Sequence, residues 1–187
     1  MNEINFTANY IKNVTIQKRY YNKYIPHKVA LVEMDPKNKY DIDAIYKTAN
    51  YWDGSFTAFT YDDMRGLNKN ISVDSLHVYA LTNQNNNFHK PSASKILGVI
   101  EVSDDLTGKK IEVLQSNTDY IYNKYLNKTP RFKHIGKVLL NFAKEKFSNE
   151  DLHLTPTKTA VPFYEKQGWV WKGFNRLTNL MCNPKNK

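Results

Sequence analysis

The alternation of apolar and polar positions along the chain predicts a sheet protein with a few amphipathic helices. Segments with period two, or with an almost continuous apolar character, predict strands; they cover residues 28–34, 74–81, 95–102 and 110–115. Residues 95–102 contain few polar interruptions, so we expect this strand to be buried on both faces. Because loops and a turn join the last three segments, these strands are expected to form an antiparallel meander.

The first segment with helical periodicity covers residues 41–52. We expect Asp41 to be its N-cap, since an aspartate side chain can accept a hydrogen bond from a free N–H group of the first turn. Asp53 and Gly54 end the pattern. One face of this helix is predicted to be buried, and it consists of Ile42, Ile45, Tyr46 and Ala49.

A second helix is predicted to begin at residue 135, directly after a basic stretch. Arg131, Lys133 and Lys137 surround its start, and Gly136 lies in its first turn. A helix start exposes unpaired N–H groups and the positive end of the helix dipole, so this basic turn is a candidate phosphate site. The apolar positions at i, i+3, i+4 and i+7 form one stripe, namely Ile135, Val138, Leu139 and Phe142.

After this helix the pattern changes to a strand, a short helix and further strands. Residues 152–154 read as a strand, and residues 169–174 and 177–181 as two closing strands. We expect Thr159 to cap the short helix and Gly168 to end it in a left-handed conformation. The order of elements predicts a mixed α/β fold.

Composition is typical of a globular protein. With 187 residues, of which 41% are hydrophobic, residues 1–187 are expected to form one domain, in which residues 1–27 are an N-terminal extension or first-strand region. No apolar run approaches the roughly 20 residues of a membrane span, and the first residues lack the pattern of a secretory signal. Cys182 is the only cysteine, which excludes an internal disulfide and fits a reducing compartment. We therefore expect a cytoplasmic protein.

The formal net charge of +9 is compatible with an anionic ligand, an anionic surface or nucleic acid. Tyrosines interleave with basic residues in residues 18–24, a pattern that can stack bases but that is also typical of an exposed strand. The lysines are scattered along the chain, so a solvated basic surface is the favoured interpretation and nucleic-acid binding a minor alternative. The five histidines lack the spacing of metal ligands, and no metal site is expected.

Two motifs relate this chain to a known family. The basic turn matches a phosphate-binding pattern, Arg/Gln-x-x-Gly-x-Gly/Ala, through Arg131 and Gly136, with His134 at the position of the first glycine. A later pattern, Ala-x-x-x-Tyr-Glu-Lys-x-Gly-Phe, is matched by Ala160, Tyr164, Glu165, Lys166, Gly168 and Trp169. With both motifs in this order, residues 95–175 resemble the GNAT acyltransferase superfamily, whose members transfer an acyl group from coenzyme A, usually to an amine.

The resemblance implies a mixed α/β (α+β) fold with a mainly antiparallel central sheet, flanking helices and a splayed fourth strand. It implies acetyl-CoA as the acyl donor, with coenzyme A as the product, and direct attack by an unidentified amine in a ternary complex. The pantetheine arm would lie along the backbone of Val113, Leu114 and Gln115 and contact Thr157. The diphosphate would be held by Arg131, Phe132, Lys133, His134, Ile135, Gly136 and Lys137.

The resemblance also implies catalytic roles. Tyr164 would protonate the departing thiolate as a general acid. Glu112 on the fourth strand is the candidate base, and Glu101 on the third strand is an alternative. Both glutamates are equally compatible with surface carboxylates that pair with lysine.

Several alternatives are left open. His134 either points its ring outward, where it adds a donor to a phosphate, or distorts the turn and weakens cofactor binding. In the second case the chain would be a GNAT-fold module with impaired catalysis, which binds nucleic acid or a protein partner through its basic, tyrosine-rich surface. Phe56, Phe59 and Tyr61 either line the acceptor pocket or pack in the core. The loop at residues 116–130 is longer than the family pattern. A homodimer is compatible with the sequence.

Overall fold

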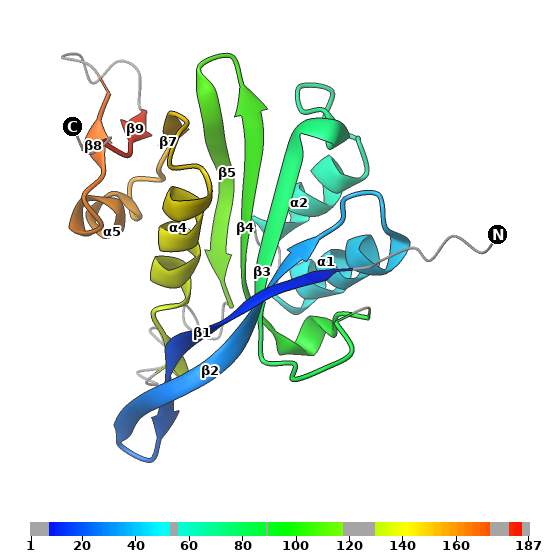
Figure 1. Ribbon diagram of the computed structural model, residues 1–187, viewed down its shortest axis with the longest axis vertical. Helices are drawn as coiled ribbons and strands as arrows, with labels where there is room; N and C mark the ends of the chain where they lie inside the picture. Colours follow the sequence, from blue (N-terminus) through cyan, green and yellow to red (C-terminus); the bar gives the residue numbers. More distant parts are fainter. Residues whose placement is uncertain (1–7, 53–55, 89, 118–129, 173–179, 185–187) are drawn as a thin grey trace.

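The computed structural model describes residues 8–52, 56–88, 90–117, 130–172 and 180–184. The described strands form one nine-stranded sheet in the order β6-β1-β2-β3-β4-β5-β7-β9-β8 (Figure 1). Neighbouring strands are antiparallel except for β5 and β7, which are parallel. The predicted mainly antiparallel, mixed α/β fold is therefore confirmed. The strands are β1 (Asn9–Tyr20), β2 (Lys23–Met34), β3 (Leu76–Thr82), β4 (Ile96–Asp105), β5 (Gly108–Ser116), β6 (Phe132–Lys133), β7 (Leu152–Leu154), β8 (Val170–Trp171) and β9 (Met181–Cys182).

Helices cover both faces of the sheet (Figure 1). The helices α1 (Lys39–Tyr51) and α2 (Thr57–Met64) pack on one face, and α4 (Ile135–Lys146) with the short α5 (Val161–Lys166) packs on the other. Two 3-10 turns, η1 (Val73–Ser75) and η2 (Ala93–Lys95), precede β3 and β4. None of the helices in the described ranges combines the length and apolar character that crossing a membrane requires.

A hydrophobic cluster lies on each face of the sheet. Successive residues of a strand point to opposite faces, so Val99 of β4 packs with α1 and α2, whereas Ile100 packs with α4. Residues 96–103 are all buried. The prediction of a central strand that is buried on both faces is confirmed, and the double burial explains why this stretch has few polar residues.

The N-terminal part of the chain is a long hairpin. β1 pairs with β2 from Asn9, opposite Glu33, to Tyr20, opposite Lys23. Of residues 1–27, predicted as an extension or first-strand region, residues 9–20 form β1 and residues 1–7 lie outside the described residues. The strand predicted at residues 28–34 begins earlier, at Lys23. In Figure 1 the turn of this hairpin projects from one end of the sheet.

The start of α1 differs from the prediction. Its N-cap is Asn38, whose side-chain oxygen accepts a hydrogen bond from the Tyr40 N–H group at 2.8 Å, so the assignment of Asp41 as the N-cap was wrong. Asp41 is buried instead and accepts a hydrogen bond from the Asp35 N–H group at 2.8 Å; its burial raises its pKa to about 6. Tyr46, predicted to be buried, is 46% exposed. The buried positions of α1 are Asp41, Ala44, Ile45, Thr48 and Ala49.

The end of α5 matches the prediction. Gly168 has φ 81° and its N–H group donates to the carbonyl of Glu165 at 2.9 Å, while the Trp169 N–H group donates to the carbonyl of Tyr164 at 3.1 Å. These two bonds form a Schellman motif, in which glycine adopts the left-handed conformation without steric strain. β8 and β9 follow as the closing strands; residues 173–179 and most of the 116–130 loop lie outside the described residues.

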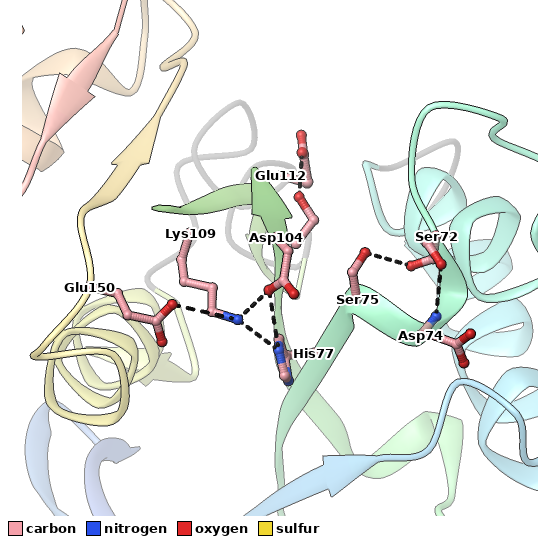
Figure 2. Close-up of polar contacts among 9 residues, drawn as sticks. Ser72, Asp74, Ser75, His77, Asp104, Lys109, Glu112 and Glu150 are labelled. Atoms are coloured by element: carbon pink, nitrogen blue, oxygen red, sulfur yellow. Dashed lines mark hydrogen bonds and ion pairs between the residues drawn. The ribbon is translucent and has the colours of Figure 1, made fainter. Parts of the chain in front are cut away.

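Polar contacts hold the first residues of β5 against their neighbours (Figure 2). Lys109 of β5 pairs with Asp104 of β4, and its Nζ atom lies 3.2 Å from Nε2 of His77 on β3 and 3.7 Å from an oxygen of Glu150. The Lys109 N–H group donates to the carbonyl of Asp151 at 2.8 Å. These contacts keep β5 close to β7 at this end of the strand.

Candidate active site

β5 has a strand partner along the whole of one edge but only along part of the other. Its pairing with β4 extends to the end of the strand, whereas its pairing with β7 ends at Ile111, opposite Leu154. Alternate residues of a strand direct their N–H groups to opposite sides. Some N–H groups of residues 112–116 therefore point to an edge where, among the described residues, no strand pairs. This divergence is the splay that the resemblance implies, and it contains three of the predicted cofactor contacts: Val113, Leu114 and Gln115.

The N-terminus of α4 lies at the end of this open edge. A Cβ atom at Gly98 of β4 would lie 2.4 Å from Cγ2 of Ile135 and 3.1 Å from the carbonyl oxygen of Gln115. The absence of a side chain at Gly98 allows the first turn of α4 to lie directly on β4 and β5. Two predicted parts of the cofactor site, the strand edge and the helix start, are therefore adjacent.

The turn before α4 keeps a regular helix start although a histidine occupies the glycine position. His134 is the N-cap, is exposed, and has φ 71° and ψ 8°. Its carbonyl accepts a hydrogen bond from the Val138 N–H group at 2.9 Å, so the first helical bond is formed. Glycine adopts a positive φ freely, and histidine is among the other residues that are enriched there. His134 does not distort the turn.

The start of α4 has the features of an anion site. The N–H groups of Ile135, Gly136 and Lys137 come before the first donor of the helical hydrogen-bond pattern and have no acceptor within the helix. Arg131, Lys133 and Lys137 are exposed around them. The positive end of the helix dipole and three cationic side chains thus act on the same region.

The N-terminal hairpin contacts this turn, a feature that the sequence did not predict. Two residues of the turn form β6 (Phe132–Lys133), which pairs with β1. The Tyr24 hydroxyl of β2 donates a hydrogen bond to the carbonyl of Pro130 at 2.6 Å. The Lys133 ammonium lies 3.9 Å from the centre of the Tyr24 ring, within the range of a cation–π interaction. Part of the tyrosine-rich segment 18–24 therefore supports the turn.

α5 brings the second motif next to the same turn. A Cβ atom at Gly136 would lie 3.5 Å from the Phe163 ring, an ordinary contact distance. The Lys144 ammonium of α4 donates a hydrogen bond to the carbonyl of Gln167 at 2.6 Å. Tyr164, which follows Phe163, is buried, and burial raises its pKa to about 12. Its hydroxyl is therefore protonated at neutral pH.

The connection from β7 to α5 carries Thr157, which is exposed. Its hydroxyl oxygen lies 3.3 Å from that of Thr159. The N-cap of α5 is Ala160, without a side-chain hydrogen bond, so the assignment of Thr159 as the cap was wrong. The helix follows a tight turn, in which the Ala160 N–H group donates to the carbonyl of Thr157 at 2.9 Å.

Glu112 lies on the face of β5 that α2 covers. The Ser103 hydroxyl donates a hydrogen bond to Glu112 at 2.8 Å (Figure 2), and the Lys110 ammonium lies 2.7 Å from its other carboxylate oxygen. A register shift between Glu101 and Val102 makes Glu112 the extra residue of a β-bulge. Bulges redirect a side chain relative to the regular strand, and here the result is a largely buried carboxylate with two partners.

Glu101 of β4 is fully buried and faces Thr60 and Asp63 of α2. Its carboxyl group interacts with both of these side chains, although neither of its oxygens has a hydrogen bond of regular geometry among the described residues. Burial, together with the nearby Asp63, raises the pKa of Glu101 to about 9. Its interpretation as a surface carboxylate was therefore wrong. At neutral pH the group is protonated and cannot accept a proton.

A pocket of about 440 Å³ lies between α2 and β5. Val113 belongs both to its wall and to the open edge of β5, so the pocket borders the edge where the pantetheine arm is expected. Residues of its wall include Phe56, Phe59, Asp62, Asp63, Glu112 and Val113. Of the two alternatives for the aromatic segment, Phe56 and Phe59 line a pocket, whereas Tyr61 packs against the core.

Asp62 and Asp63 were not among the predicted site residues. Two adjacent acids within an aromatic stretch are a weak signal, because such pairs are common on exposed helix faces. Only the packing of α2 against β5 places both of them in the wall of a pocket. Within the described ranges, no group of three or more His, Cys, Asp or Glu side chains could hold a metal ion.

Comparison with known proteins identifies the family. The GNAT acetyltransferase domain model matches residues 56–179, about two thirds of the chain. This chain belongs to the GNAT acetyltransferase family. The match includes the open edge of β5, the basic turn and α5, which are the parts of the GNAT protein described above.

Solved structures of GNAT proteins are similar to this chain at low sequence identity. A protein assigned to the GNAT family from Desulfovibrio desulfuricans has 9% identity and a TM-score of 0.52, and the alignment covers 78% of this chain and 87% of that chain. PaiA N-acetyltransferase from Thermoplasma acidophilum, in complex with coenzyme A, has 13% identity and a TM-score of 0.49 over 83% and 99% of the two chains. A GNAT acetyltransferase from Staphylococcus aureus Mu50 has 14% identity and a TM-score of 0.46 over 82% and 98%. A search of curated proteins found no match.

Proposed function

We propose that this GNAT protein transfers an acetyl group from acetyl-CoA to a primary amine by direct attack in a ternary complex. The observation that carries the proposal is the open edge of β5, which ends at the N-terminus of α4. Free strand N–H groups can donate hydrogen bonds to the amide and thioester oxygens of a ligand. The start of α4 can bind the diphosphate of the same ligand. One extended thioester would therefore fill both parts.

Packing requires glycine at one position of the site, Gly98, but not at another, Gly136. Gly98 is needed for packing, because a side chain there would overlap Ile135. Gly136 is not, since a Cβ atom would lie at an ordinary distance from Phe163 and alanine is the better helix former. We propose that glycine at position 136 allows the diphosphate to approach the backbone closely. Arg131, Lys133 and Lys137 would pair with its negative charges.

The transfer step requires two proton movements. The amine nitrogen forms a bond to the thioester carbonyl carbon as the carbon–sulfur bond breaks. The nitrogen loses one proton and the sulfur gains one, which yields an amide and free coenzyme A. We assign donation to the sulfur to Tyr164, whose hydroxyl is protonated at neutral pH. Removal of the amine proton is assigned to Glu112, directly or through water, and a hydrogen bond to the pantetheine arm to Thr157.

Cofactor binding tests the first part of this proposal. Acetyl-CoA at about 100 times its Kd should raise the free energy of unfolding by ~2.7 kcal/mol, measured as a shift in thermal or urea unfolding. Gly136→Ala should leave the free protein as stable or slightly more stable and weaken acetyl-CoA binding at least about tenfold. Asn141→Ala, at an exposed position of the same helix, is the matched control and should bind normally. The absence of any shift with acetyl-CoA and with coenzyme A would refute the proposal.

Turnover tests the role of Tyr164. Removing a general acid reduces the rate typically by ~10²–10⁴-fold, so Tyr164→Phe should lower kcat within this range while the Kd for acetyl-CoA stays unchanged. Tyr46→Phe, at a half-exposed tyrosine of α1, controls for the loss of a hydroxyl. A Tyr164→Phe enzyme with normal kcat would assign the proton donor to another group.

We also propose that the described elements act as one domain, because β1 and β2 share the sheet with the segment that matches the family. A cytoplasmic location is proposed from the lone Cys182, which fits a reducing compartment. Fractionation of cells that express the protein would test the location.

A further inference from the structure

The pocket between α2 and β5 differs in charge from the protein as a whole. The chain has a formal net charge of +9. The described residues of the pocket wall nevertheless include three carboxylates, from Asp62, Asp63 and Glu112, and no lysine, arginine or histidine. A wall of this kind attracts cations and repels anions. The pocket is therefore suited to a cationic ligand, unlike the basic start of α4.

A buried carboxyl group lies behind the same wall. Glu101 is directly opposite Val113 in the β4–β5 register, and residues that face each other across a ladder point to the same face of the sheet. Val113 is part of the pocket wall. The Glu101 side chain is 0% accessible, and its polar neighbours include Thr60 and Asp63 of α2. Glu101 therefore lies behind Asp63 and Val113 of the pocket wall and does not itself reach the pocket.

Apart from Asn68, the other described residues of the wall are apolar or aromatic. Phe56 and Phe59 are 53% and 58% exposed, with ring centres 6.0 Å apart. Exposed aromatic rings can contact methylene groups, and their faces attract ammonium groups. The wall thus combines contacts for a short aliphatic chain with acceptors for more than one positive charge.

We propose that this pocket binds the acceptor, and that the acceptor is a small aliphatic amine with a second cationic group, a diamine or a longer polyamine. The proposal rests on the acetyl transfer proposed above and identifies its acceptor class. One amino group would be acetylated at the edge of β5 beside Val113, where the pocket and the cofactor path meet. The other would be held by Asp62 and Asp63 of α2, and the chain between them would lie against Phe56 and Phe59.

A comparison of matched amines tests this inference. Acetylation of 1,4-diaminobutane should proceed with a kcat/KM at least about 30-fold higher than that of n-butylamine, because charge-assisted hydrogen bonds to the second ammonium are available only to the diamine. Asp62→Asn should reduce this preference about tenfold or more, with little effect on n-butylamine. Asp74→Asn removes the same charge from an exposed residue outside the pocket and should preserve the preference.

Equal kcat/KM for the two amines would overturn the inference. So would an unchanged preference in the Asp62→Asn enzyme, or acetylation confined to the lysine side chain of a peptide. These outcomes are distinct from failure of the proposed function, which would appear as no stabilisation by acetyl-CoA or coenzyme A.

Discussion

The buried carboxyl of Glu101 should make the stability of the protein depend on pH in a way that one substitution removes. Glu101 is fully buried against α2, and burial raises its pKa from 4.5 to about 9. Glu101→Gln keeps the shape of the protonated side chain but cannot ionise. The wild-type protein and this variant should therefore differ in the slope of stability against pH.

The sign and size of this difference follow from the pKa in the two states. Below pH 4.5 the carboxyl is protonated in both the folded and the unfolded chain. Between pH 4.5 and 9 the unfolded chain loses the proton while the folded protein keeps it, so the free energy of unfolding falls by about 1.4 kcal/mol per pH unit. From pH 5 to pH 8 the wild-type protein should therefore lose up to about 4 kcal/mol more than Glu101→Gln.

Urea unfolding at pH 5, 6, 7 and 8 measures this slope directly. The difference between the two proteins at a single pH is less informative, because a buried amide without a partner has its own unfavourable effect. Glu145→Gln is the control, since the Glu145 side chain is 71% exposed and pairs with Lys12 on the surface. The slope of this variant should match that of the wild-type protein. Equal slopes for wild type and Glu101→Gln would show that Glu101 is ionised in the folded protein, and the argument for its burial would fail.

Three further substitutions test the architecture of the cofactor site. His134→Gly should raise the free energy of unfolding by up to about 1 kcal/mol, because glycine adopts φ 71° without strain. A lower free energy of unfolding, measured with urea, would show that the histidine side chain stabilises the turn. Gly98→Ala should lower stability by about 1–3 kcal/mol and weaken acetyl-CoA binding in calorimetry, since the new Cβ would overlap Ile135; normal binding would exclude a role for this contact. Tyr24→Phe should cost about 1 kcal/mol through loss of its bond to Pro130 and raise the KM for acetyl-CoA but not for the amine; an equal change in both KM values would contradict a local role.

The parts of the fold that the sequence predicted are those that depend on local patterns. The 3.6-residue period places α4 correctly, and the apolar run at residues 95–102 identifies the central strand. Gly168 marks the end of α5 because a positive φ at this position is a local requirement. Asp41 was misassigned because Asn38, slightly earlier in the chain, has equal capping chemistry, and only the burial of Asp41 against the sheet separates the two.

The parts that could not be predicted depend on contacts between distant segments. The hydrogen bond between Tyr24 and Pro130 joins residues that are 106 positions apart, and no local pattern encodes such a pair. The sequence around Glu101 does not distinguish a buried glutamate from an exposed one. Glu101 is buried because α2 covers that face of β4. His134 was interpreted from its departure from a motif, whereas its φ explains both why glycine is usual there and how histidine replaces it.

The distribution of charge favours the enzymatic interpretation over a general affinity for nucleic acid. A nucleic-acid surface requires basic residues along one face, whereas here the start of α4 is basic and the pocket beside α2 is acidic, with β5 between them. An anionic thioester and a cationic amine need fields of opposite sign, and a ternary complex needs the two fields to meet at the reacting atoms. They meet at Val113, which belongs to the open strand edge and to the pocket wall. Under the proposed function, the basic start of α4 binds the acyl donor and the acidic pocket binds the acceptor. β5 lies between the two regions, and the reactive groups of donor and acceptor would meet beside it.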